Sequence, residues 1–174
     1  EDFCRRAREV SSTGASPFNH YIEPDPDQML RVSVAVAFRR ARLQHVYSVL
    51  RGKDMETGEV SESRRSKQFK LLREAQDYAL DLQNWHEYFK CLLKAGYRSG
   101  QMVSSETGLL YTYALYLIGR RDYGADSHAL RSVIAKWFFM SQLTGRYTSS
   151  PETAMEQDLA KLRRVKDAAG FVST

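Results

Sequence analysis

The sequence predicts an all-α fold, a single-domain bundle of about six or seven helices over residues 1–174. Apolar residues recur at spacings of three and four along most of the chain, which is the helical period. Glycine, proline and capping residues separate these periodic segments, and no segment has a neighbour with which it would pair as a strand. A domain of this length buries about two-thirds of its unfolded surface, so it needs no disulfide or metal to fold.

The chain opens with a short helical segment over 3–10, followed by a Ser/Thr/Gly loop over 11–16. The first long helix starts in the stretch EPDPDQ. There Asp25 can cap the helix and Pro26 suits its first position, because a proline has no backbone N–H to leave unpaired. We expect this helix to continue to about Leu50.

Part of this helix, VSVAVAF, alternates bulky and small residues, which is also the pattern of a strand. The helical interpretation is favoured because Ser33, Ala35 and Ala37 suit close helix packing and no partner strand is near. The run also continues into a stretch with helical spacing, carried by Leu43, Val46, Tyr47 and Leu50. We therefore predict a helix here, with a strand as the alternative.

A polar loop over 52–66 separates this helix from the next one. From Lys67 onward an amphipathic stripe predicts a helix, and it consists of Phe69, Leu72, Gln76, Ala79 and Leu82. Asn84 stands three residues before Glu87, which resembles a capping box. A new helix is expected to start there, or the first one to bend, and Gly96 to end it.

Three more helices are predicted in the C-terminal half. Ser104 or Ser105 can cap the first, whose wide apolar face is typical of a central helix and is formed by Leu109, Leu110, Tyr113, Leu117 and Ile118. The second is expected over 127–143. The last starts with Ser150 as its cap and Pro151 at its first position.

The stretch KWFFMSQLTGRYTSS poses the question of why an apolar helix ends on an arginine and a tyrosine. Its wide apolar arc predicts a largely buried helix and is formed by Trp137, Phe138 and Phe139. Gly145 fits the left-handed position that ends a helix. Arg146 can then donate to the last carbonyl groups or pair with an acid, while Tyr147 packs back on the last turn. Contact with a ligand is the alternative.

The formal net charge is +5, and cations gather in the stretches 31–53, 64–73 and 161–166. Clustered cations can bind phosphates and release counterions, which drives nucleic-acid binding, but they are also typical of solvated helix faces. Neither a zinc-finger spacing nor an RNP-type signature accompanies them. The candidate contacts to DNA or to a protein partner are Arg39, Arg40, Arg42 and Arg146.

The sequence predicts no catalytic residue, no cofactor and no metal site. It contains no GxSxG, P-loop or GxGxxG motif, and no two histidines stand at a spacing of three or four. We interpret Cys4 and Cys91 as reduced thiols of a cytoplasmic protein, with a disulfide between them as the alternative. No apolar run reaches about 18 residues, so a membrane span is not expected.

Several short motifs resemble the helical region of the GmrSD-type DUF family. In KWFFMSQLTGRYTSSPETAMEQDLAKL, an aromatic helix, a Gly-Arg-Tyr turn, a serine-rich cap and then Asp158 follow one another as in that family. The pair Asn84-Trp85 and the triplet AGY at 95–97 look similar to the same region. The resemblance covers about 18–162.

The resemblance implies a place in a modification-dependent restriction protein of bacteria or archaea. Members of the family carry an N-terminal ParB/sulfiredoxin-like domain with an Asp-Gly-Gln-Gln-Arg motif, linked to nucleotide hydrolysis and DNA cleavage, and many add an HNH nuclease. Neither motif is present here. The resemblance therefore implies a fragment that follows the catalytic domain of a longer protein, and no catalytic residue of the family transfers to it. The start at Glu1 rather than at a methionine agrees with a processed product or with a piece of a longer protein.

Three functional hypotheses follow. The leading one is a non-catalytic accessory module of a DNA-targeting defence protein, which contributes DNA contact or interdomain support. The second is a protein-interaction scaffold without a nucleic-acid role. The third is a small-molecule enzyme, which would need polar residues converging in a cavity, and the sequence spacing supplies no such cluster.

Overall fold

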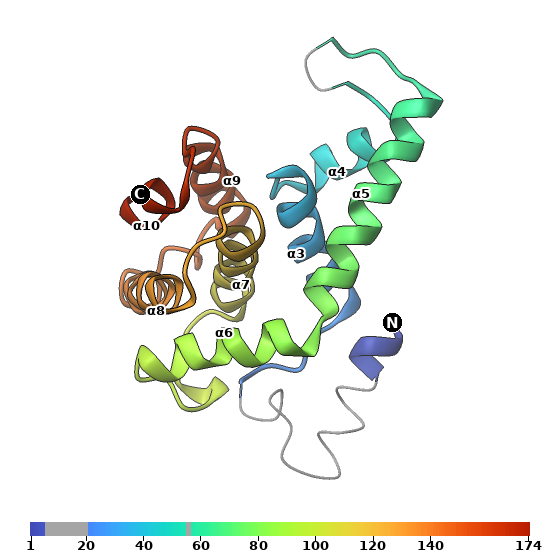
Figure 1. Ribbon diagram of the computed structural model, residues 1–174. Helices are drawn as coiled ribbons and strands as arrows, with labels where there is room; N and C mark the ends of the chain where they lie inside the picture. The colour runs from blue at the N-terminus through green and yellow to red at the C-terminus, as the bar shows by residue number, and fades with distance from the viewer. Residues whose placement is uncertain (6–20, 55–56) are drawn as a thin grey trace.

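The computed structural model describes residues 1–5, 21–54 and 57–174. These parts form an all-α bundle, which confirms the predicted fold class (Figure 1). Within them the β-structure is limited to an isolated bridge between Lys53 and Val60. The same parts contain no helix long and apolar enough to span a membrane. Most of the predicted N-terminal segment over 3–10, and the loop over 11–16, lie outside the described residues.

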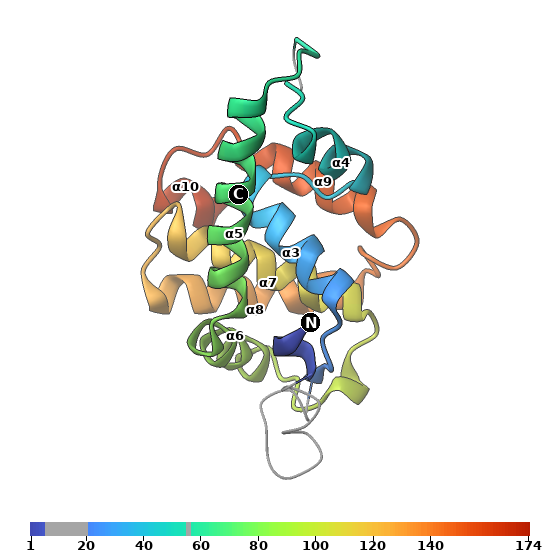
Figure 2. The same ribbon diagram turned by 90° about the vertical axis from the view of Figure 1, so that its right-hand side faces the viewer.

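In chain order the helices are α3 (Pro26–Phe38), α4 (Leu43–Leu50), α5 (Glu62–Leu80), α6 (Leu82–Lys94), the 3-10 turn η1 (Gly100–Met102), α7 (Glu106–Arg121), α8 (Ser127–Leu143), α9 (Pro151–Leu162) and α10 (Ala168–Ser173). Helix α7 packs against α3, α6, α8 and α9, so it is the centre of the bundle. Helix α5 lies along α3 at the outer side, as Figures 1 and 2 both show.

The wide apolar face of α7 predicted a central helix, and the position of α7 in the bundle confirms this. Every residue from 108 to 119 is buried, and Ser105 caps the helix by accepting a hydrogen bond from the N–H of Gly108 at 3.0 Å. A helix buried all round needs partners for its polar side chains. The hydroxyl of Tyr113 donates to the carbonyl oxygen of Ala79 at 3.0 Å, and its ring stacks on Trp85 with centroids 3.8 Å apart.

The stretch VSVAVAF is helical, as predicted, but the expected single helix up to Leu50 is wrong. Helix α3 ends at Phe38, and Arg39 takes a left-handed conformation with φ 54° before α4 begins. The reason is a carboxylate from a distant helix. Glu156 accepts the backbone N–H groups of Ala41 at 2.7 Å and Arg42 at 3.4 Å, which would otherwise join a helical ladder.

The boundary between α5 and α6 also differs from the prediction. Helix α5 begins at Glu62 rather than Lys67, and Asp81 caps α6 by accepting from the N–H of Gln83 at 2.8 Å. The predicted cap, Asn84, is instead a buried side chain that donates to the carbonyl oxygen of Tyr78 at 2.9 Å. Sequence spacing placed the break three residues late because another capping residue, Asp81, competes for the same role.

Some predicted apolar stripes face solvent. On α5 the buried residues are Ala75 and Ala79, whereas Phe69 and Leu82 of the predicted stripe are exposed. Small alanines let α5 approach α3 closely, so this face needs no large side chain. The prediction that 127–143 is a largely buried helix is also wrong for one face, where the exposed residues are Phe139, Met140 and Leu143.

Two smaller predictions concern caps and thiols. Pro151 occupies the first position of α9 as expected, but the side chain of Ser150 makes no capping hydrogen bond. Cys4 and Cys91 are both buried and not joined to each other, which confirms the thiol interpretation. Burial raises the pKa of Cys91 to about 12, so this thiol is protonated and unreactive near neutral pH.

Candidate functional site

The four arginines predicted as contact residues do not form one patch. Arg39, Arg40 and Arg42 lie in the linker between α3 and α4, beside α9. Arg146 lies in the turn between α8 and α9. Within the first group Arg40 pairs with Glu156, whereas Arg146 pairs with Asp158. These two acids are two residues apart in α9, so they point about 160° apart around its axis. The structure therefore brings the first three together and leaves Arg146 on the other side of α9.

The linker arginines are engaged with acceptors on neighbouring helices. Arg40 donates from Nη1 to Oε1 of Glu156 at 2.8 Å, and Arg39 pairs with Asp122 at the end of α7. Burial alone would raise the pKa of Glu156, but the backbone N–H of Ala41 and the guanidinium of Arg40 outweigh it, so the pKa lies below its usual range. These arginines fasten the linker to α7 and α9.

Arg146 and Tyr147 both bind the same buried carboxylate. Arg146 donates from Nε to Oδ2 of Asp158 at 2.9 Å and from Nη2 to Oδ1, and the hydroxyl of Tyr147 donates to Oδ2 at 2.8 Å. The side chain of Asp158 is only 5% exposed. The prediction that Gly145 takes a left-handed conformation is confirmed by its φ of 62°, and so is the pairing of Arg146 with an acid.

The guanidinium of Arg146 also lies over the ring of Trp137, 5.5 Å from its centroid. Burial, with the nearby charge of Asp158, raises the pKa of Tyr147 far above its ordinary value, so the hydroxyl keeps its proton and stays a donor. The arginine and tyrosine at the end of this apolar helix therefore close the fold by holding α9 against α8.

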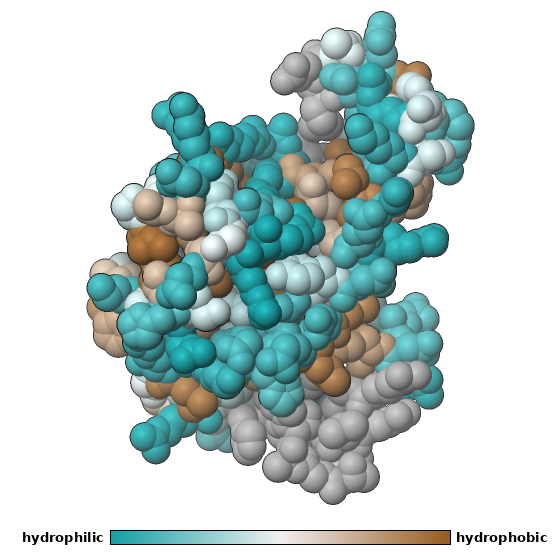
Figure 3. Space-filling model, in the orientation of Figure 1, coloured by the Kyte–Doolittle hydropathy of each residue, from teal (hydrophilic) through white to brown (hydrophobic). Residues whose placement is uncertain are grey.

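A different set of cations lies along α5. Lys67, Lys70 and Arg73, called here the α5 cationic face, are exposed and make no ion pair with any described residue. Their spacing of three places them along one side of α5. Helix α5 runs along the outer edge of the bundle in Figure 1, and its side of the molecule is largely hydrophilic in Figure 3.

The cations just before this face are partly neutralised. Arg64 pairs with Asp54 at 3.4 Å, and Arg65 pairs with Glu62 at 3.4 Å. The guanidinium of Arg65 also lies over the exposed ring of Phe69, 5.7 Å from its centroid. The excess positive charge of this helix therefore lies further along, at the α5 cationic face.

Polar residues from three helices converge in a hollow of about 300 Å³, which is lined by Gln83, Glu87, Cys91, Tyr116, Arg120, Ser127, Leu130 and Arg131. Arg131 donates to Oε2 of Glu87 at 3.1 Å, and Arg120 donates from Nη1 to the hydroxyl oxygen of Tyr116 at 3.1 Å. Sequence reasoning missed this hollow. Its signal was a spacing of four on each of the three helices, which puts Gln83, Glu87 and Cys91 on one face of α6, Tyr116 and Arg120 on one face of α7, and Ser127 and Arg131 on one face of α8.

Most of the polar side chains in this hollow form hydrogen bonds or ion pairs with neighbouring side chains. Glu87 also accepts from Nζ of Lys90 at 2.5 Å, and Arg120 donates to Oδ1 of Asn84 at 2.9 Å. Burial raises the pKa of Tyr116 to about 12, although Arg120 opposes the shift. In the described part of the chain, no three His, Cys, Asp or Glu side chains are placed to hold a metal. The hollow therefore offers hydrogen bonds and charge, without an evident base or nucleophile.

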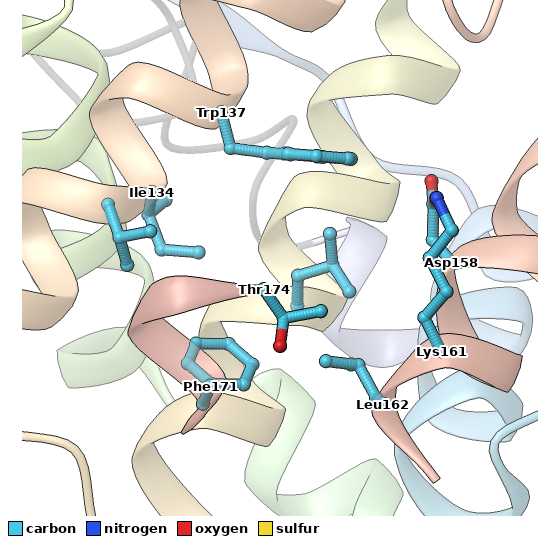
Figure 4. Close-up of a pocket in the computed structure, with 9 residues that line it drawn as sticks. Ile134, Trp137, Asp158, Lys161, Leu162, Phe171 and Thr174 are labelled. Atoms are coloured by element: carbon cyan, nitrogen blue, oxygen red, sulfur yellow. The ribbon is translucent and has the colours of Figure 1, made fainter. Parts of the chain in front are cut away.

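A second, smaller cavity of about 80 Å³ lies between α7, α8, α9 and α10 (Figure 4). Its lining is mainly apolar and comprises Leu115, Val133, Ile134, Trp137, Asp158, Lys161, Leu162, Phe171 and Thr174.

No protein-family model, curated protein or solved structure matches this chain. The similarity to the GmrSD-type family therefore rests on the quoted motifs. Two of them are structural in this fold: Asn84 joins α5, α6 and α7, and the Gly-Arg-Tyr turn binds Asp158. A function that draws on the resemblance remains a proposal.

Proposed function

We propose that this chain is a non-catalytic helical module of a DNA-targeting protein of the bacterial or archaeal defence type, and that the α5 cationic face contacts DNA phosphates. The observation that carries the proposal is the absence of acidic partners for Lys67, Lys70 and Arg73 within the described residues, on an exposed helix. Cations without partners bind phosphates at no cost in existing ion pairs, and the release of counterions drives the association.

The arginines first favoured by the sequence support this role less well. To bind a phosphate, Arg40 would have to leave Glu156, and Arg146 would have to leave the buried Asp158. Leaving a buried carboxylate unpaired is costly. We therefore assign the linker arginines and Arg146 to interdomain or interhelix support, and DNA contact to the α5 cationic face.

The test is a triple charge reversal, Lys67→Glu, Lys70→Glu and Arg73→Glu, with binding to a duplex of about 30 base pairs measured by fluorescence anisotropy between 50 and 200 mM salt, the range over which phosphate contacts lose affinity. We expect binding to weaken and the salt slope to fall by about 2.7, or about 0.9 for each phosphate contact. The matched control is Lys136→Glu, Arg164→Glu and Lys166→Glu, which changes the net charge equally at exposed positions without recorded ion pairs. Equal losses in both triples would contradict the assignment to α5.

The rest of the proposal concerns the parent protein. A ParB-like domain upstream would supply nucleotide hydrolysis and cleavage, and this chain would act beside it in the cytoplasm. The full reading frame tests this part, because the proposal requires an Asp-Gly-Gln-Gln-Arg motif before the helical region.

A protein-interaction scaffold is the second candidate, favoured by the exposed apolar residues of α8. Met140 is 49% exposed and Leu143 is 69% exposed, on one side of the helix beside Phe139. Exposed apolar groups that lie together are typical of contact surfaces between proteins. This candidate predicts no DNA binding at low salt by the unmodified chain, so the same anisotropy titration separates the two.

A further inference from the structure

The polar hollow between α6, α7 and α8, which pack together in Figure 1, carries more positive than negative charge. Its lining includes two arginines, Arg120 and Arg131, and one acid, Glu87. Both oxygens of that acid are already bound by cations, because Oε1 accepts from Lys90 at 2.5 Å and Oε2 accepts from Arg131 at 3.1 Å. Arg120 makes no ion pair with any described residue, and its two side-chain partners are neutral. The cluster therefore sets three cations against one acid.

A further acid, Asp126, stands next to Ser127, which lines the hollow. The carboxylate of Asp126 caps α8 by accepting from the N–H groups of His128 at 2.9 Å and Ala129 at 3.0 Å. An acid at the start of a helix is stabilised there by the N–H groups that it accepts and by the positive end of the helix dipole. Asp126 is not part of the lining, so the positive charge of the hollow stays unmatched.

The hollow also contains hydrogen-bond donors without acceptors. Tyr116 is only 4% exposed, and its oxygen accepts from Nη1 of Arg120, so its own proton must point to another acceptor. No described residue supplies that acceptor. In the same part of the chain, Nε and Nη2 of Arg120 and Nε and Nη1 of Arg131 make no hydrogen bond either. Because a buried donor without an acceptor is costly, the hollow favours an occupant rich in acceptor oxygens.

The buried part of the lining is uncharged, and the space suits a small molecule. Burial raises the pKa of Cys91 to about 12 and the pKa of Tyr116 to about 12, so both groups keep their protons at neutral pH and add no negative charge. The volume of about 300 Å³ reaches the lower end of the range for ligand pockets, which is roughly 300–1,000 Å³. Most of the lining is polar, so a polar body fits it better than an apolar one.

We infer that this hollow binds a small phosphate monoester with a polar body. Such a group carries a charge of about −1.5 to −2 at pH 7 and has three strong acceptor oxygens, which matches both the excess of cations and the donors without acceptors. Arg120 and the hydroxyl of Tyr116 bind the phosphoryl oxygens from α7, and Arg131 binds them from α8. A guanidinium suits this role because its N–H groups form a fork that fits two phosphate oxygens.

The rim of the hollow can bind the rest of the molecule. Gln83 and Ser127 are exposed, and their side chains make no recorded hydrogen bond, so both can contact hydroxyl groups of the ligand. A carboxylate has one charge and two oxygens, and it would leave part of the excess charge unmatched. The inference does not depend on DNA binding by α5, so either can fail alone.

The direct test is isothermal titration calorimetry of the 174-residue chain at constant ionic strength with glycerol phosphate, compared with dimethyl phosphate and lactate. We expect saturable binding of glycerol phosphate. Dimethyl phosphate and lactate should bind about 10-fold more weakly, since each carries one charge and loses charge-assisted hydrogen bonds. The absence of saturable binding, or equal binding of the three, overturns the inference. Tighter binding of dimethyl phosphate would assign the hollow to a phosphodiester such as the DNA backbone, and would overturn it too.

Two variants locate the binding. Tyr116→Phe keeps the ring and removes the O–H group, so it should weaken binding of glycerol phosphate by about 10-fold, whereas a hydroxyl with a purely structural role would leave the affinity unchanged. Arg120→Gln removes the charge and the fork and should weaken binding by at least about 10-fold. The matched controls are Tyr47→Phe on α4 and Arg164→Gln, two exposed positions that do not line the hollow.

The melting temperature is measured for every variant without ligand, so that loss of folding is distinguished from loss of the site. Tyr116→Phe should stay folded, because the hydroxyl donates to no described residue. Should Arg120→Gln unfold the chain, Arg120→Lys keeps the charge, loses the fork and is expected to weaken binding by a smaller factor. Unchanged affinity in folded Tyr116→Phe and folded Arg120→Lys would place the ligand elsewhere and refute the inference.

Discussion

Two cation-rich regions of this chain look alike in the sequence and differ in the fold. In the linker between α3 and α4, Arg40 is matched by Glu156, which is 116 positions away in the sequence. On α5, Lys70 and its neighbours in the α5 cationic face make no ion pair with any described residue. The difference teaches that a run of cations indicates a binding surface only where the fold supplies no acid to match it, and the acids that decide this come from distant segments.

The largest expected difference between paired and unpaired cations is in the free energy of unfolding. Arg146 belongs to the matched class, and Arg146→Ala leaves a carboxylate that is 5% exposed with the hydroxyl of Tyr147 as its remaining hydrogen-bond donor. Breaking a buried pair costs about 3–5 kcal/mol, and since Arg146 is itself 30% exposed we expect about 3 kcal/mol from chemical denaturation. Arg164→Ala, an exposed arginine without a recorded ion pair, is the control. A loss no larger than that of the control would remove Arg146 from the matched class.

The fold could be predicted from the sequence wherever local signals acted alone. The start of α3 at Pro26, the burial of α7 and the bounds of α8 all follow from spacing and caps. The break after Phe38 could not be predicted, because it depends on hydrogen bonds from the linker to Glu156. The exposure of Phe69 is another miss, since periodicity cannot tell which helix face meets small alanines.

The candidate sites were less predictable than the helices. The pairing of Arg146 with an acid was foreseen, but its partner Asp158 was seen only as part of a resemblance. The hollow around Arg120 and Arg131 unites side chains of three helices, and the apolar cavity unites four, so both exist only after packing. The runs of cations can be seen in the sequence. The acids that neutralise some of them come from distant segments and are known only from the fold.

The second test of the comparison uses the linker. Glu156→Gln keeps the size of the side chain but removes the charge that accepts from Arg40 and from the N–H of Ala41. The charge-assisted hydrogen bonds that Glu156 accepts are together about 1–2 kcal/mol stronger than neutral ones. We therefore expect the free energy of unfolding at pH 7 to fall by about that amount. Glu74→Gln, at an exposed position of α5, controls for the loss of one negative charge.

The loss should also depend on pH. The pKa of Glu156 in the folded chain lies below its ordinary value of 4.5, so its stabilising effect is present above that value and disappears as the pH falls through the folded pKa. The difference in unfolding free energy between the native chain and Glu156→Gln should therefore shrink as the pH falls below 4.5. A difference that stays constant from pH 7 to pH 3 would mean that the glutamate acts through its shape and not through its charge.

The smallest change in stability is expected at the α5 cationic face. A substitution there should alter DNA binding without altering the stability of the fold. Lys70 is exposed and has no recorded ion pair, so Lys70→Ala removes no contact within the fold, and we expect the unfolding free energy to stay within about 0.5 kcal/mol. Alanine is also a better helix former than lysine by a few tenths of a kcal/mol, which limits any loss further. If the α5 cationic face binds DNA, the same substitution should lower the salt slope of binding by about 0.9, the share of one phosphate contact. Denaturation and salt-dependent anisotropy on this one variant decide the matter: a stable fold with an unchanged slope would mean that lysines without acidic partners are only solvated, and that the contrast between the two regions concerns folding alone.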